Sequence, residues 1–264
     1  MPNPPVPQEL VERMIDLLRS DIGALQACCL VNKTWVSRSR YHLFYQVEIL
    51  DDTQLHYWIS TFPYPVSNVA GFVRHLHIAR PRMLDVSEFS LEQFTDLEYF
   101  SLGDIPDPTT RLEVAAMANI LLLPTPLRSI RLCLERIRAW DISSLFQRFH
   151  SLEDLSLLCH VICSQRGIED TITLEASPKL RGELKIITKN DLTLFAALLE
   201  SLPNGMHFTR ASIAIPLEQP RTINTLLQPL AHTLTSLSIE ISPRSEFNRR
   251  CGRNRYSRAF RFLP

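Results

Sequence analysis

The sequence predicts an α/β protein in which three short N-terminal helices precede an irregular array of alternating strands and helices. Capped helical patterns fill residues 6–50, and a six-residue apolar pattern returns every 24 to 30 residues after residue 51. We therefore divide the chain into a flexible N-terminus (1–5), a helical unit (6–50), a repeat-like array (51–243) and a basic tail (244–264).

The first predicted helix carries apolar side chains on two faces. One face holds Leu10, Met14, Leu17 and Leu18, and the other holds Val11, Ile15 and Leu18. A single core can bury only one such face of a helix. We therefore expect the second face to be covered by the rest of the chain or by a partner protein.

Two more short helices are predicted before residue 50. Ser20 or Asp21 can cap the second helix, which runs through Cys29. Asn32 can cap the third helix, which carries Trp35 among its apolar residues. The helical unit is therefore expected to contain three helices.

Four segments of this unit stand in a characteristic order. They are Pro7-Gln8-Glu9-Leu10-Val11, Ile15-Asp16-Leu17-Leu18, Ala27-Cys28-Cys29-Leu30-Val31-Asn32-Lys33-Thr34-Trp35 and Arg40-Tyr41-His42-Leu43-Phe44. Together they resemble an F-box, although Val6 and Thr34 stand where that family usually has a Leu and a basic residue. An ordinary helical cap on a repeat domain is the alternative.

The resemblance implies a module that binds the Skp-type adaptor of a cullin-based SCF ubiquitin ligase. The residues expected to build or support the adaptor surface are Pro7, Glu9, Leu10, Val11, Ile15, Leu18, Leu30, Val31 and Trp35.

From residue 51 onward, a strand-like pattern is apolar at its first, fourth and sixth positions. It occurs at residues 73–78, 97–102, 127–132, 152–157, 181–186, 208–213 and 234–239. Successive sixth positions lie 24, 30, 25, 29, 27 and 26 residues apart. Arg181 breaks the apolar pattern and Ala211 is small, so the fifth and sixth occurrences are the weakest.

Helical patterns mostly fall between these strands. They cover residues 54–62, 112–122, 142–149, 192–202 and 223–234. A strand and a helix repeated at this period resemble an irregular leucine-rich-repeat solenoid, in which each unit buries its apolar face against the next. A compact α/β domain on a parallel sheet remains the alternative.

The same pattern predicts a binding surface, because neighbouring side chains of a strand point to opposite faces. If the first, fourth and sixth positions face the core, the third and fifth face outward. The expected target-binding residues are His75, His77, Tyr99, Arg131, Asp154, Glu183, Lys185 and Arg210. A polar stripe of this kind suits a protein target.

The composition, 45% hydrophobic and 21% charged, is typical of globular proteins. Lys plus Arg equals Asp plus Glu at 28 each, so the whole molecule has no net field that selects nucleic acid or anionic lipid. Without a signal-like or membrane-spanning run, and with 6 irregularly spaced Cys, we expect a cytoplasmic and/or nuclear protein.

Motifs of catalysis and metal binding are weak. Cys159, His160 and Cys163 lie close in sequence, but no second cluster completes a zinc site. The chain has 7 Gly and lacks a G-x-S-x-G elbow and a phosphate-binding loop. We therefore expect no metal, no cofactor and no catalytic residue, and a protein that is not an enzyme.

The tail at residues 244–264 carries seven Arg and one Glu, interleaved with aromatic residues. This pattern allows nucleic-acid binding, although a solvated terminus is the simpler interpretation. The function predicted by the whole chain is that of a substrate receptor in an SCF ubiquitin ligase complex of the ubiquitin conjugation pathway. A non-ligase scaffold or a nucleic-acid-binding protein that uses the tail is the alternative.

Overall fold

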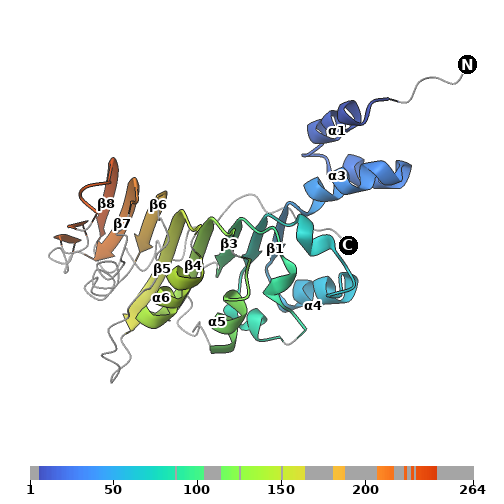
Figure 1. Ribbon diagram of the computed structural model, residues 1–264. Helices are drawn as coiled ribbons and strands as arrows, with labels where there is room; N and C mark the ends of the chain where they lie inside the picture. Colours follow the sequence, from blue (N-terminus) through green and yellow to red (C-terminus); the bar gives the residue numbers. More distant parts are fainter. Residues whose placement is uncertain are drawn as a thin grey trace, which may run out of the picture.

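The computed structural model describes residues 6–86, 88–103, 114–124, 126–149, 151–163, 181–187, 207–216, 223–224, 227–228 and 230–242. Within them the chain forms a mixed α/β structure with six α-helices and one eight-stranded parallel sheet. The N-terminal helices lie beyond one end of the sheet (Figure 1). The predicted helix at 192–202 and the basic tail at 244–264 lie outside the described residues.

The three predicted N-terminal helices are present. They are α1 (Gln8–Leu17), α2 (Ile22–Val31) and α3 (Lys33–Phe44). Asp21 caps α2 by accepting a hydrogen bond from the N–H of Ala24 at 2.9 Å, and Asn32 caps α3 by accepting from the N–H of Thr34 at 3.0 Å. Each cap satisfies a backbone donor that the helix itself leaves unpaired, which explains why the helices begin at these residues.

The helical unit has a small core of its own. Val11 and Ile15 of α1 pack with Leu25 and Cys28 of α2, and Leu18, Trp35 and Leu43 lie against this cluster. The cluster is separate from the larger core under the sheet. The two parts of the chain therefore bury their apolar residues in different places.

The sheet follows the order of the chain from end to end. Its strands are β1 (Gln46–Ile49), β2 (His75–Ile78), β3 (Tyr99–Leu102), β4 (Ser129–Arg138), β5 (Asp154–Cys163), β6 (Glu183–Ile187), β7 (Arg210–Pro216) and β8 (Ser236–Ser242). Each strand pairs in parallel with the next one along the chain. All seven occurrences of the apolar pattern predicted from the sequence fall on these strands.

The strands are aligned position by position with the sequence pattern. The fourth positions form one row across the sheet, in which Leu76 pairs with Phe100, Phe100 with Ile130 and so on to Leu237. From β2 to β5 the first, fourth and sixth positions are all buried. Arg181, which breaks the pattern before β6, is exposed.

The sequence analysis missed strand β1. Residues 44–49 carry the same pattern, with Phe44, Val47 and Ile49 at its apolar positions, and β1 pairs with β2 in the same register. The pattern was hidden because Phe44 also ends α3. The repeated pattern therefore begins inside the segment that was assigned to the helical unit.

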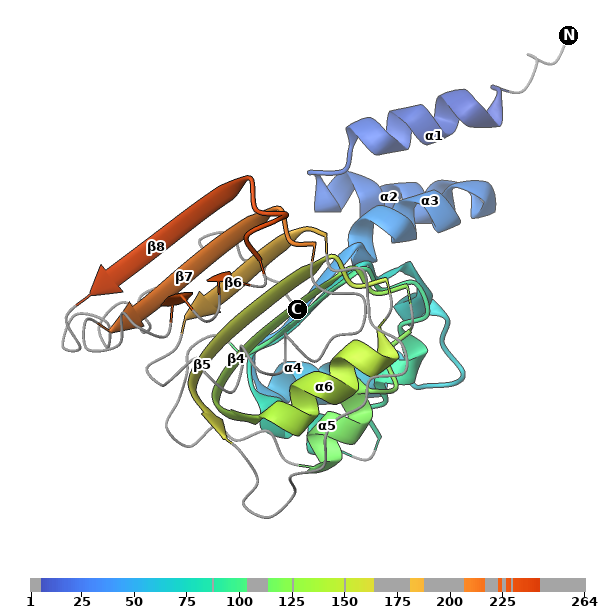
Figure 2. The same ribbon diagram turned by 60° about the vertical axis from the view of Figure 1, so that its left-hand side comes forward.

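Three α-helices lie on one side of the sheet: α4 (Asp52–Thr61), α5 (Val114–Ile120) and α6 (Ala139–Arg148) (Figure 2). They contribute Leu55, Trp58, Met117, Ile120 and Phe146, among others, to the core under the sheet. Three short 3-10 helices complete this layer: η1 (Val69–Phe72), η2 (Pro81–Asp85) and η3 (Leu91–Gln93). The opposite side of the sheet carries the third and fifth positions of the pattern.

Aromatic contacts join the helical unit to the sheet. The rings of Phe44 and Phe62 meet edge to face at 5.3 Å, and the ring of Tyr45 lies 4.9 Å from that of His75. The carbonyl of Tyr45 accepts hydrogen bonds from the N–H groups of Arg74 and His75. The end of α3 is thereby held against the first two strands.

Candidate protein-interaction surfaces

Helix α1 divides its apolar residues between an inner and an outer face. On the inner face, Val11 and Ile15 are 7% and 1% exposed. On the outer face, Leu10, Met14 and Leu17 are 50%, 60% and 85% exposed. The two faces expected from the sequence are both present, and the helical core uses only one of them.

Helix α2 adds two exposed aliphatic side chains at its C-terminal end. Leu30 and Val31 are 89% and 66% exposed. We call Leu10, Met14, Leu17, Leu30 and Val31 the outer apolar residues. Large aliphatic groups in water are unfavourable when they gather on one small unit, and such groups commonly mark a site of protein contact.

The residues expected at the adaptor surface divide into two groups. Pro7, Glu9, Leu10, Leu30 and Val31 are exposed, whereas Val11 and Ile15 are buried and Leu18 and Trp35 pack against them. The second group can support a surface but cannot form one. Met14 and Leu17 were not among the residues expected at the adaptor surface, although the sequence analysis placed them on the same helix face as Leu10.

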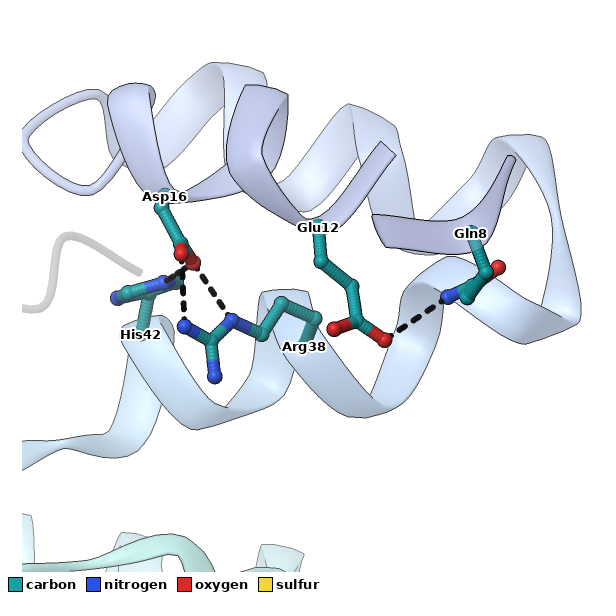
Figure 3. Close-up of polar contacts among 5 residues, drawn as sticks. All are labelled: Gln8, Glu12, Asp16, Arg38 and His42. Carbon is teal, nitrogen blue, oxygen red and sulfur yellow. Dashed lines mark hydrogen bonds and ion pairs between the residues drawn. The ribbon is translucent and has the colours of Figure 1, made fainter. Parts of the chain in front are cut away.

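A polar cluster joins α1 to α3 beside this surface (Figure 3). The guanidinium of Arg38 donates to both carboxylate oxygens of Asp16, from Nε at 2.5 Å and from Nη2 at 2.7 Å. The Nε2 atom of His42 lies 2.7 Å from Asp16 Oδ1. The Arg38 hydrogen bonds, with the His42 contact, lower the pKa of Asp16 to about 2.

This cluster links two helices that share a small core. A bidentate Arg–carboxylate pair holds both partners in one geometry. The Asp16 side chain is still 38% exposed, so water screens the pair and limits its contribution to stability. The cluster nevertheless ties α1, which carries three of the outer apolar residues, to α3.

On the sheet, the predicted target-binding residues share the face opposite the helices. Arg210 is exposed, and the others are half-buried: His75, His77, Tyr99, Arg131, Asp154, Glu183 and Lys185. The third-position row pairs His75 with Tyr99, Tyr99 with Ser129 and Ser129 with Asp154. The fifth-position row contains His77, Arg131 and Lys185, separated by serines.

One polar position of this face is closed to solvent. Ser101, between His77 and Arg131 in the fifth-position row, is buried. The carboxylate of Asp154 already has an intramolecular partner, because its Oδ1 accepts a hydrogen bond from the N–H of Glu183 at 2.6 Å. The usable surface is therefore less uniform than strand alternation alone predicts.

The first strands carry an aromatic column at the third-position row. The rings of His75 and Tyr99 stack with centroids 5.4 Å apart, and Tyr45 lies on the other side of His75. Tyr41 meets Tyr45 edge to face at 5.5 Å. Burial lowers the pKa of His75 and favours its neutral form, and the nearby carboxylate of Glu98 partly opposes this effect.

Sequence reasoning selected His75 and Tyr99 but missed Tyr41 and Tyr45. Both belong to the end of α3, and only the register between β1 and β2 brings Tyr45 beside His75. The apolar pattern of residues 44–49 could have located Tyr45 from the sequence. In that pattern Gln46 holds the third position, the row of His75, and Tyr45 directly precedes it.

The described residues contain no group of three or more His, Cys, Asp or Glu that could hold a metal ion. Backbone positions of Cys159 to Cys163 end β5, but their side chains lie outside the described set. A hollow of about 330 Å³ is lined by Leu227, Ala231, Leu234, Thr235, Ser236 and Leu237. None of these described lining residues titrates near neutral pH.

No protein-family model matches the chain, and no curated protein matches it significantly. Among the described residues, every helix is too short or too polar to cross a membrane. The surfaces described above must therefore be interpreted from their own chemistry.

Proposed function

We propose that this protein is a substrate-recruiting subunit of a cullin-based SCF ubiquitin ligase. In this proposal the N-terminal helices are an F-box that binds the Skp-type adaptor. The remaining strands and helices are an irregular leucine-rich-repeat array that binds a target protein through the polar face of its sheet.

The division of α1 into two apolar faces carries the adaptor half of the proposal. Val11 and Ile15 complete the helical core, which leaves Leu10, Met14 and Leu17 in water. Burying a large aliphatic side chain contributes about 2 kcal/mol. A partner that covers these three side chains therefore gains a substantial free energy of binding. The F-box resemblance implies that this partner is the Skp-type adaptor.

The order and register of the sheet support the repeat half. Eight parallel strands follow one another in chain order, and the same pattern position of each strand occupies the same row. Among the described residues, the helices and 3-10 helices between these strands lie on one side of the sheet (Figure 2). The other side carries the polar third and fifth positions, which in this proposal bind the target.

The proposed role requires no catalysis by this chain. A receptor that binds both the ligase and the target converts their encounter into a local one, which raises the effective concentration of the target at the ligase. Ubiquitin transfer is then performed by other subunits.

Adaptor binding by the full chain tests the proposal. We expect the Leu10→Asp, Leu17→Asp double variant to lose co-purification with the Skp-type adaptor, because it places two charges among the outer apolar residues. Val66→Asp is the matched control, since Val66 is 86% exposed and lies after α4. Unchanged adaptor recovery by the double variant would contradict the assignment.

Ile15 is unsuitable for this test, although the sequence alone made it attractive. Its side chain is 1% exposed in the helical core, so Ile15→Asp would unfold the unit instead of altering its surface. If the wild-type chain binds no adaptor at all, the alternative of a scaffold outside the ligase is favoured.

A further inference from the structure

The last strand of the described sheet, β8, exposes the residues at pattern positions that the earlier strands bury. On β7, the inward-facing Ala211, Ile213 and Ile215 are at most 3% exposed. The equivalent residues of β8, namely Leu237, Ile239 and Ile241, are 45%, 40% and 45% exposed. The apolar face of the sheet therefore extends onto β8, where the described residues leave it partly exposed.

Strand β8 forms a regular edge of the described sheet. It pairs with β7 over all seven residues without a bulge, and it is the last strand in the order of the described sheet. Natural edge strands are usually protected by Lys, Pro, a bulge or a twist. The sequence of β8, SLSIEIS, contains no Lys, Arg or Pro.

The outward-facing N–H and C=O groups of β8 are oriented to pair with another strand. The N–H of Ser236 donates to the carbonyl of Thr209, so the even-numbered residues of β8 face β7. Because alternate residues of a parallel strand direct their backbone groups to opposite sides, those of Leu237, Ile239 and Ile241 point to the outer edge. The same three residues carry the exposed aliphatic side chains.

We propose that β8 is a homodimer interface, in which it pairs in antiparallel orientation with β8 of a second copy about a two-fold axis at Ile239. Ile239 is the midpoint of Ser236–Ser242, so this register overlaps the two strands completely. It places Ile239 opposite Ile239 of the second copy, and Leu237 opposite Ile241. These are the residues whose backbone groups face the edge.

The pattern of β8 favours a second copy over an unrelated strand. An antiparallel pair about a two-fold axis perpendicular to the sheet keeps both apolar faces on the same side. Six aliphatic side chains then cover one another, and Ser238 lies opposite Glu240. Shifting the axis to Glu240 would place two carboxylates directly opposite each other, which is unfavourable. The inference does not depend on the ligase assignment.

Sedimentation of the full chain tests the proposal. We expect the wild type to form a dimer whose population rises with concentration, and Ile239→Lys to weaken it at least about tenfold, because two ammonium groups meet at the axis. Val66→Lys, an exposed substitution elsewhere, should leave the dimer unchanged. A wild type that remains monomeric at every concentration, or a dimer that Ile239→Lys does not weaken, would overturn the proposal.

A cross-link tests the register without adding charge. Facing residues of antiparallel strands have Cα atoms about 4.5–5.5 Å apart, within the range that a disulfide spans. We expect Ile239→Cys to give a covalent dimer on mild oxidation, and Val66→Cys to give no more than the wild type. Equal cross-linking of the two variants would exclude the Ile239 axis, and circular dichroism would show that both retain their fold.

Discussion

His75 and Tyr99 lie directly opposite each other on β2 and β3, and their rings stack at 29° with centroids 5.4 Å apart. Tyr45 packs against the other side of the His75 ring. The imidazole is therefore held between two tyrosines at the junction of the helical unit and the sheet. Protonation of His75 would place a charge in a half-buried stack.

The first prediction concerns the pH dependence of this stack. Burial lowers the pKa of His75 in the folded state, so the unfolded chain binds its proton more tightly. Stability should therefore fall as the pH drops through the unfolded value of about 6.5. The urea midpoint should decrease between about pH 7 and about pH 5, and less so in His75→Phe, which keeps a ring but does not titrate.

An equal decrease of the midpoint in both proteins would show that other groups cause the effect. Glu98 stabilises the protonated form of His75 and opposes the burial effect. The Glu98→Gln variant should therefore make the loss at acidic pH steeper, which provides a second measurement of the same stack.

The second prediction concerns Asp16 and Arg38. Because hydrogen bonds from Arg38 hold the pKa of Asp16 at about 2, the pair contributes stability at pH values above the ordinary aspartate pKa of about 4. That contribution is lost as the pH falls from about 4 to about 2. At neutral pH, Asp16→Asn should cost the helical unit about 1 kcal/mol, since the exposed site is screened by water.

Hydrogen exchange of the full chain can detect this local loss. Amides of α1 and α3 should exchange faster in Asp16→Asn, whereas those of the sheet should not change. Glu12→Gln is the matched control, because Glu12 lies on the same helix and accepts an exposed hydrogen bond from Gln8 at 3.2 Å (Figure 3). Equal effects of the two variants would contradict a specific role for Asp16.

The strands after residue 51 were predictable because alternation is tied to burial. A residue at an apolar pattern position faces the core, and a shift of one residue would expose the whole set. The same rule failed to locate β1, because Phe44 serves both the last turn of α3 and the first apolar position of the strand. It also could not give the lengths of β4 and β5, which continue to Arg138 and Cys163.

The interaction surfaces were only partly predictable. Helical spacing showed that α1 has two apolar faces, but it could not decide which face packs inward. That choice depends on Leu25 and Cys28, which come from α2 and meet Val11 and Ile15 in three dimensions. Similarly, Ser101 occupies an outward position by alternation and is nevertheless buried.

The third prediction concerns Asn119 of α5, which sequence reasoning did not select. Its Nδ2 donates to the carbonyls of Leu84 and Phe89, each at 2.9 Å, and its Oδ1 accepts from the N–H of Leu91 at 3.0 Å. One side chain thus pairs three backbone groups in the segment between β2 and β3. Replacing it leaves those groups without these partners.

We expect Asn119→Ala to lower the free energy of unfolding by about 2–3 kcal/mol, because unsatisfied buried polar groups cost about 1–3 kcal/mol each and water can reach some of them. Urea denaturation measures this loss. The control is Asn224→Ala, since Asn224 is exposed. A cost no greater than that of the control would mean that these hydrogen bonds are replaced by water without penalty.

The last prediction concerns the target surface. Tyr99 ends the aromatic column, and Arg131 lies on the adjacent strand in the fifth-position row. Aromatic and Arg side chains commonly dominate the energy of protein interfaces, and Tyr99 is already ordered by its stack. Tyr99→Ala with Arg131→Ala should therefore weaken target recruitment by about 2 kcal/mol or more, on the order of thirtyfold, and leave adaptor binding intact.

Comparison of the co-purifying proteins of wild type and double variant measures this effect. The control double variant, Tyr57→Ala with Arg148→Ala, removes the same side-chain types from α4 and α6, on the other side of the sheet. Because Tyr99 is half-buried, thermal denaturation must first show that the double variant is folded. If wild type and double variant then recover the same proteins, the target binds outside the polar face, and the connections between strands become the next segments to test.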